Sequence, residues 1–135
     1  MNEIVFSIGG IEFKAKLLEK EAPERCREFW NALPIETNLH HAKMAGFEVL
    51  CYFFKPGLKL SEKNENKRFI RDMNPGDIWG NGFGFGMVYG EVSNEPSPQN
   101  VFARVTEKGE LEKMKKACIS VWRNNGQKIT VRKSG

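Results

Sequence analysis

The sequence predicts a mainly β fold: a closed β-barrel of about eight strands with two flanking α-helices, in one domain spanning residues 1–135. Two observations carry this prediction. Short runs of alternating or continuous apolar residues recur along the chain, whereas only two segments have apolar residues at helical spacing. The length of 135 residues also matches the commonest size of one domain. Many strands with two helices favour a capped barrel over an alternating parallel sheet.

Residues 4–17 have the clearest strand pattern. Ile4, Phe6 and Ile8 alternate with other residues, and the alternation resumes over residues 11–17. The two runs are separated by Gly9 and Gly10, a pair suited to a two-residue hairpin turn. We therefore expect a β-hairpin at the start of the chain.

The pattern changes to a helical period at residues 21–33. Pro23 suits the first turn of a helix, and Pro34 ends it. Residues 35–42 and 46–54 then read as two strands, with Lys55-Pro56-Gly57 closing the second. We expect the helix to lie against the sheet.

The second half of the chain contains one further helix. We expect a polar surface loop at residues 59–68, a turn at 74–77, and one or two strands rich in glycine and aromatic residues at 78–92. A loop at 93–100 precedes a strand at 101–106. Helical spacing begins at Glu110 and ends near Asn124, and residues 128–133 alternate as a last strand.

Composition indicates a soluble globular protein, with 40% hydrophobic and 28% charged residues. No apolar run approaches the roughly 20 residues that cross a bilayer, and the N-terminus lacks the basic start of a signal peptide, so we expect a cytoplasmic protein that binds no membrane. Cys26, Cys51 and Cys118 form no metal or disulfide motif, and we expect reduced thiols. The net charge is +4, but aromatic residues do not interleave with the basic stretch after Glu112, so nucleic-acid binding is not expected.

Four segments resemble parts of the cyclophilins, in the same order and with similar spacing. They are VFSIGGIEFKAKLLEKEAPERCREFWNAL, HHAKMAGF, NPGDIWGNGFGFGMVYG and NVFARVTEKGELEKM. The chain is more closely similar to an uncharacterised bacterial and archaeal family of small cyclophilin-like proteins, through Ala32-Leu33-Pro34-Ile35 and Gly76-Asp77-Ile78. The resemblance implies a cyclophilin-like barrel in a prokaryotic protein, and it implies no established reaction.

The residues that the resemblance associates with prolyl isomerisation are missing. Ala42 falls at the position of the cyclophilin catalytic arginine, or His41 if the alignment shifts by one residue. The active-site glutamine position falls on Leu50, and the 93–100 loop lacks the tryptophan and histidine of family members. Rotation about the peptide bond has a barrier of roughly 18–20 kcal/mol, and lowering it requires a hydrogen-bond donor, such as arginine, to the prolyl amide. We therefore expect no ordinary prolyl isomerase activity.

Two other patterns that could indicate a site are better explained by structure. His40 and His41 lie near Glu36 and Glu48, but adjacent strand residues point to opposite faces, so the two histidines cannot chelate one ion. The glycines over residues 80–86 alternate strictly and lack the spacing of a dinucleotide fingerprint. We interpret them as sites of close packing and expect neither a metal nor a cofactor.

The leading functional hypothesis is binding of a small organic ligand or a peptide segment in a pocket lined by aromatic residues and histidine. Alternatives are an enzyme that acts on a small metabolite with a histidine or Glu36 as acid-base group, and, more remotely, a divergent prolyl isomerase. Exposed aromatic residues could also form a homo-oligomer interface. No catalytic residue is assigned. The candidate binding residues are Pro34, Glu36, His40, His41, Phe47, Trp79, Phe83, Phe85 and Tyr89.

Overall fold

The fold is seen in a computed structural model that describes residues 2–52, 59–82, 84–92 and 96–135. Most elements of the described residues are strands, and the others are two α-helices and one 3₁₀ turn. In chain order they are β1 (Glu3–Ile8), β2 (Ile11–Leu17), α1 (Pro23–Ala32), β3 (Ile35–His41), β4 (Gly46–Tyr52), β5 (Lys67–Phe69), η1 (Ile70–Asp72), β6 (Asp77–Asn81), β7 (Gly84–Val92), β8 (Pro98–Arg104), α2 (Lys108–Arg123) and β9 (Gln127–Lys133).

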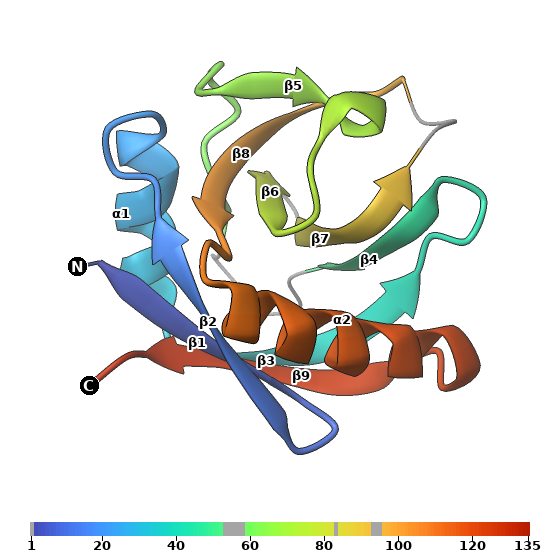
Figure 1. The fold of residues 1–135 in the computed structure, drawn as a ribbon. Coiled ribbons are helices and arrows are strands. Elements are labelled where there is room, and N and C mark those ends of the chain that lie inside the picture. Colours follow the sequence, from blue (N-terminus) through green and yellow to red (C-terminus); the bar gives the residue numbers. More distant parts are fainter. Residues whose placement is uncertain (1, 53–58, 83, 93–95) are drawn as a thin grey trace.

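The strands form a closed barrel, which confirms the predicted fold class. Its order is β2-β1-β9-β3-β4-β7-β6-β8, and β8 returns to β2 through the pairs Lys16↔Arg104 and Leu17↔Ala103. All of these pairings are antiparallel. The short β5 lies outside this ring and pairs with β8 (Figure 1).

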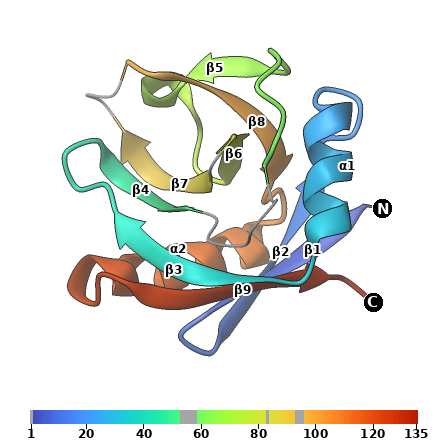
Figure 2. The same cartoon turned by 180° about the vertical axis from the view of Figure 1, so that it is seen from behind.

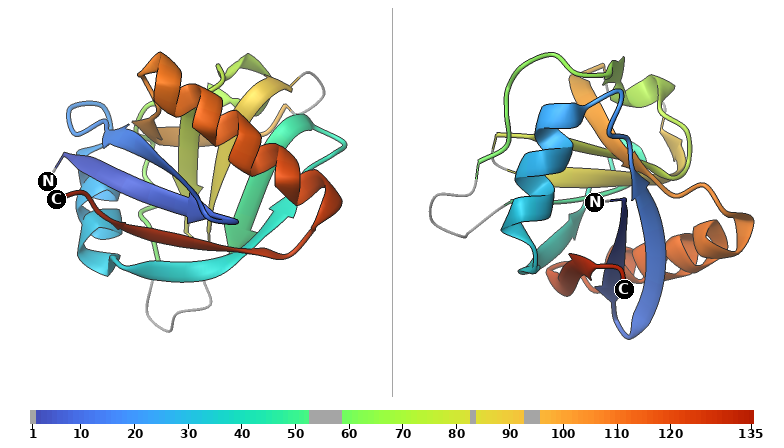
Figure 3. Two further views of the ribbon diagram at one scale, coloured as in Figure 1. Left: turned by 60° about the horizontal axis from the view of Figure 1, so that its bottom comes forward. Right: turned by 90° about the vertical axis from the view of Figure 1, so that its left-hand side faces the viewer.

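Both helices pack on the barrel through apolar faces. α2 crosses one face of the barrel and contacts β2, β3, β4 and β7, whereas α1 lies on another side and contacts β8 (Figure 3). The two termini lie next to each other, where β1 pairs with β9 (Figure 2). Neither of the described helices is long and apolar enough to cross a membrane.

Aromatic rings fill much of the barrel interior. Phe6 stacks on Phe13 with ring centroids 5.3 Å apart, and Phe29 from α1 meets both Phe85 and Phe102. Cys26, Cys51 and Cys118 are free and buried, as expected for small reduced hydrophobes. Burial raises the pKa of Cys51 to about 12, so this thiol stays protonated at neutral pH.

The predicted bounds of the loops at 59–68 and 93–100 were wrong at their C-terminal ends, where the structure has strands. Residues 67–69 form β5, which pairs with Pro98, Gln99 and Asn100 at the start of β8. Local alternation could not predict this pairing, because all three β5 residues are exposed on both faces of the strand. Leu60, inside the predicted surface loop, is buried in the core. The segment 55–57, predicted as a turn, lies outside the described residues.

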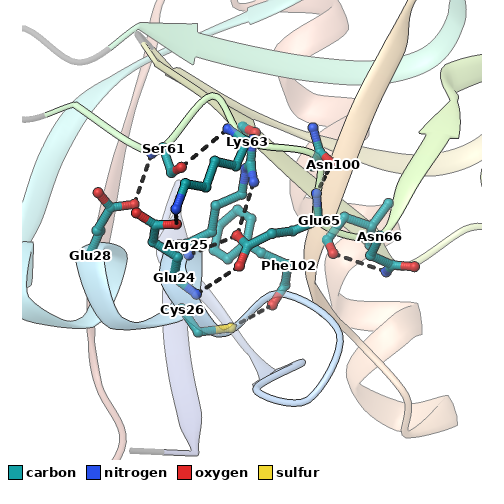
Figure 4. Close-up of polar contacts among 12 residues, drawn as sticks. Glu24, Arg25, Cys26, Glu28, Ser61, Lys63, Glu65, Asn66, Asn100 and Phe102 are labelled. Carbon is teal, nitrogen blue, oxygen red and sulfur yellow. Dashed lines mark hydrogen bonds and ion pairs between the residues drawn. The ribbon is translucent and has the colours of Figure 1, made fainter.

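A buried ion pair fastens the segment before β5 to α1 (Figure 4). Arg25 donates from Nη1 to Glu65 Oε1 at 2.9 Å and from Nε to the carbonyl of Gly80 at 3.0 Å. The Glu65 carboxylate also accepts the backbone N–H groups of Glu24 and Arg25 in the first turn of α1. Because Ala22 offers no side-chain cap, Glu65 supplies the cap from a distant part of the chain.

Candidate functional site

A depression of about 220 Å³ lies on the outer surface of the barrel wall formed by β4, β6 and β7. β4 alternates across this wall: Val49 and Cys51 belong to the barrel core, whereas Glu48 and Leu50 face outward. We call this depression the Glu48 pocket. It is lined by Ala42, Glu48, Leu50, Cys51, Tyr52, Ile70, Trp79, Asn81, Gly84, Ser97 and Gln99.

Glu48 is a carboxylate that is only 2% exposed. Its Oε2 accepts a hydrogen bond of 2.7 Å from the indole Nε1 of Trp79. Gly86, on the neighbouring strand, leaves room for this indole: a Cβ at that position would lie 2.3 Å from Trp79 Cζ2. The alternating glycines of β7 therefore allow close packing, as the sequence indicated: the Trp79 side chain approaches Gly86, and the backbone carbonyl of Cys51 approaches Gly84.

An apolar cluster lies beside Glu48. It consists of Ile70, Met73, Trp79, Val88, Val92 and Val101, with Leu50 packed against it. A carboxylate at the border of such a cluster is poorly hydrated, which strengthens any hydrogen bond or ionic contact that it makes. The Trp79 indole N–H is one donor to this carboxylate, and a carboxylate accepts hydrogen bonds at several positions. The pocket therefore suits a ligand with an apolar body and a donor or cationic group.

The resemblance to the cyclophilins compares Leu50 with the active-site glutamine and Ala42, or His41 if the alignment shifts by one residue, with the arginine. Ala42 and Leu50 line the Glu48 pocket, and His41 does not. A methyl group and an isobutyl group stand where the isomerases carry hydrogen-bonding side chains. No donor for a prolyl amide is therefore provided at these two positions, and the charged side chain next to them is the acid Glu48.

A second concentration of aromatic residues lies between the β3–β4 turn and α2. We call His41, Phe47, Tyr89 and Trp122 the His41 cluster. His41 Nε2 and the Tyr89 hydroxyl are hydrogen-bonded at 2.5 Å, and the His41 ring meets Trp122 edge-on at 4.4 Å between centroids. Phe47 contacts both Tyr89 and Trp122.

His41 is held in its neutral form. Burial, with a smaller contribution from the charge of Lys43, lowers the pKa of His41 from 6.5 to about 4. Its Nδ1 is buried and has no hydrogen-bond partner among the described residues. Burial also raises the pKa of the Tyr89 hydroxyl above its ordinary value of 10.0. The pair is thus uncharged at neutral pH.

The predicted binding residues that the structure describes fall into separate groups. Trp79 lines the Glu48 pocket, and His41, Phe47 and Tyr89 share the His41 cluster. Phe85 is 0% exposed and packs between Phe6 and Phe29 in the core, and its part in a ligand site stays a prediction. Phe83 lies outside the described residues.

Pro34, Glu36 and His40 lie apart from both groups. Pro34 is exposed after α1, Glu36 pairs with Lys128 at 2.8 Å on the surface, and His40 Nδ1 meets the Asn125 amide at 3.2 Å. The predicted alternation of β3 is confirmed, and it is the reason for the separation: residues 36 and 40 face away from residue 41. Whether these residues bind a ligand stays a prediction.

Glu48 was mentioned beside the histidines but was not chosen as a candidate. One signal in the sequence could have identified it, because it is the only charged residue in β4, whose sequence is GFEVLCY. An acid inside an otherwise apolar strand is rarely buried without a specific partner. Its partner Trp79 lies 31 residues away and could not be recognised from local sequence.

Comparison with solved structures supports the cyclophilin-like fold. The structure of McbB in complex with tryptophan aligns with a TM-score of 0.86 at 19% sequence identity, over 98% of this chain and 45% of the McbB chain. The solution structure of the hypothetical protein AF2241 from Archaeoglobus fulgidus aligns with a TM-score of 0.69 at 20% identity, over 98% of this chain and 95% of that one. The chain thus spans less than half of McbB, and these identities relate the proteins by fold alone.

No curated protein sequence matches the chain. A family model does match, over residues 4–79, and its description is "Protein of unknown function (DUF3830)". The matched range runs from β1 into β6 and contains most of the residues that line the Glu48 pocket. The chain therefore belongs to the DUF3830 family of proteins of unknown function.

Proposed function

We propose that this protein binds a compact organic molecule in the Glu48 pocket, and that Glu48 holds a cationic or hydrogen-bond-donating group of that molecule. The buried Glu48 carboxylate, set in a depression beside an apolar cluster, is the observation that carries the proposal. A volume of about 220 Å³ lies below the roughly 300–1,000 Å³ of typical ligand pockets, which favours a small molecule.

Several of the lining residues have a definite role in this proposal. Trp79 and Leu50 form apolar walls for the body of the ligand. The amide of Gln99 offers a donor and an acceptor at the pocket, and Glu48 fixes the orientation of the ligand through a charge-assisted hydrogen bond. This mixture of apolar surface with a few polar groups is typical of small-molecule sites.

The structural neighbour McbB supports an amino-acid-sized ligand, because its structure is a complex with tryptophan. Tryptophan carries an ammonium group and an aromatic ring, the two features that Glu48 and the apolar walls would recognise. The likeness to McbB therefore guides the choice of the small molecules with which binding is tested. The proposal includes no ordinary prolyl isomerase activity, because Ala42 and Leu50 offer no donor to a prolyl amide.

The test compares two probes of similar size by isothermal titration calorimetry. Tryptamine has an indole and an ammonium group, and indole-3-propionate has an indole and a carboxylate. We expect tryptamine to bind and indole-3-propionate to bind much more weakly. Glu48→Gln keeps the shape and the acceptor for Trp79 but removes the charge, and we expect it to weaken tryptamine binding by about tenfold or more.

Glu36→Gln is the matched control, since it removes one carboxylate from the exposed surface of β3. It should leave tryptamine binding unchanged. Thermal unfolding of each variant establishes that it is folded before binding is compared. The proposal is contradicted if a folded Glu48→Gln protein binds tryptamine as tightly as the wild type, or if the wild type binds neither probe.

A second candidate function is acid-base catalysis on a small metabolite, with Glu48 as the reacting group. The same burial favours it, because apolar surroundings are how enzymes adapt carboxyl groups to proton transfer. His41, an alternative acid-base group, does not line this pocket. Glu48→Gln would then abolish turnover while leaving the binding of an uncharged substrate analogue intact.

A further inference from the structure

Three neighbouring depressions follow α2 and the end of β7, away from the Glu48 pocket. The first has a volume of about 450 Å³ and lies between Phe47, Tyr89 and the middle of α2. The second has a volume of about 340 Å³ and reaches Trp122 and Arg123. These two depressions share Phe47 and Ile119. The third, about 570 Å³, shares Gly90 and Glu91 with the first and extends to Arg71 and Pro75. We call this continuous surface the α2 groove.

The floor of the α2 groove is apolar and open to solvent. Phe47, Ile119 and Trp122 are 40%, 44% and 36% exposed. They are three of the six large apolar side chains with such exposure among the described residues. Exposed apolar side chains that gather in one place indicate a surface that another molecule covers.

The rim of the α2 groove is mainly basic. Lys115, Lys116 and Arg123 line it from α2, and Arg71 lines its far end. Lys43 adds a further charge, with its Nζ 5.4 Å from the centre of the Trp122 ring. The opposing acids in the lining are Asp72 and Glu91. Positive charge therefore exceeds negative charge along the groove, which favours an acidic occupant.

β7 extends beyond its pairing with β6 where the first and third depressions meet. Pairing between β6 and β7 ends at Ile78↔Met87, and Gly76 donates to the Val88 carbonyl, but β7 continues to Val92. Beyond Val88 no described strand pairs with this edge of β7. An extended chain can add to such an edge through backbone hydrogen bonds.

We propose that the α2 groove docks an extended peptide segment of a partner protein, with apolar side chains on the floor and flanking aspartate or glutamate residues against the basic rim. The groove is long: from Lys115 to Arg123 alone α2 rises about 12 Å. That length and the part of β7 that extends beyond β6 favour a peptide over a compact small molecule. This proposal does not depend on the function of the Glu48 pocket.

Two other occupants fit less well. In a symmetric dimer the groove would face its own copy, and Lys115, Lys116 and Arg123 would meet like charges. A nucleic acid presents phosphates at regular short intervals, and Asp72 and Glu91 would repel some of them. A peptide, unlike a nucleic acid, can carry acidic residues only at the positions that face the basic side chains of the groove.

The test selects binders from a random library of 12-residue peptides displayed on phage, with the whole chain immobilised. The enriched peptides are synthesised with a fluorescent label, and their affinity is measured by anisotropy. We expect peptides with aromatic or aliphatic residues flanked by acids, and binding that weakens as salt is raised. The double variant Lys115→Glu/Lys116→Glu should weaken binding at least tenfold, and Ile119→Ser should also weaken it.

The matched control is Lys20→Glu/Lys108→Glu, which makes the same change of charge at two exposed lysines outside the groove. It should bind the selected peptides like the wild type. The proposal is overturned if the peptides bind the Lys115→Glu/Lys116→Glu variant with unchanged affinity, or if no acidic consensus is enriched. Light scattering that reveals a dimer dissociated by that variant would assign the groove to a second copy and also overturn it, as would competition by a single-stranded oligonucleotide.

Discussion

His40 and His41 are neighbours in sequence, but their side chains lie in different surroundings. His40 meets Asn125 at the surface, whereas His41 contacts Tyr89 and Trp122 in the His41 cluster. The sequence predicted this division correctly, because residues of a strand alternate between its faces. It could not predict the partners of His41, because they come from β7 and α2, which only the folded barrel brings next to β3.

The lowered pKa of His41 predicts a loss of stability in acid. The unfolded chain binds a proton at this residue below about pH 6.5, but the folded protein does so only near pH 4. The contribution of neutral His41 to the free energy of unfolding is therefore complete above pH 6.5 and is lost as the pH falls towards 4. We expect a loss of about 1 kcal/mol, less than the full shift would give, because the ring is partly exposed.

Urea unfolding at pH 7.0, 5.5 and 4.5 measures this contribution. His41→Phe keeps an aromatic ring but cannot be protonated, so its stability should fall less than that of the wild type over this range. His40→Gln removes the other histidine and tests whether the effect belongs to His41. Parallel losses of stability in wild type and His41→Phe would show that His41 is not held neutral.

Among the elements, α1 depends on a residue far away in sequence. The bounds of α1 could be predicted closely from two prolines. Pro23 is favoured in the first turn of a helix, and Pro34 ends the helix that precedes it. The sequence did not identify its N-terminal partner. Glu65 lies in a polar stretch that resembles a solvated loop, and only the pairing of β5 with β8 brings that stretch to α1.

Removal of Glu65 should strongly destabilise the protein. Glu65→Ala leaves the buried Arg25 guanidinium without its ion-pair partner and leaves two N–H groups of α1 uncapped. We expect a loss of about 3–5 kcal/mol in the free energy of unfolding, measured by urea titration. Lys63→Ala breaks a neighbouring exposed pair with Glu24 and should cost less than about 1 kcal/mol. Similar small losses in both variants would contradict a structural role for the buried pair.

At the scale of the whole molecule, the barrel determines which predicted residues meet. The strands of the barrel, the two helices and the hairpin followed from periodicity, but β5 did not, because none of its residues is buried. The candidate site did not follow, since Glu48 and Trp79 meet through β7, which pairs with both β4 and β6. The barrel thereby separates a pocket with a buried acid on its outer wall from an aromatic groove beside α2.

The three tryptophans report on three different parts of the molecule. Trp79 donates its indole N–H to Glu48 in the pocket, and Trp122 lies in the α2 groove. Trp30 lies on α1, where Lys133 approaches its ring at 4.9 Å. Each has one indole N–H resonance, so a single NMR spectrum distinguishes the pocket, the groove and the remainder of the surface.

Titration of ¹⁵N-labelled protein with tryptamine, followed by the three assigned indole N–H resonances, tests the proposed ligand site most directly. The proposal predicts that the Trp79 resonance shifts progressively and saturates, because the ligand contacts Glu48, the acceptor of that N–H. The Trp30 resonance should stay in place. A shift of Trp122 or Trp30 without any change at Trp79 would contradict binding in the Glu48 pocket.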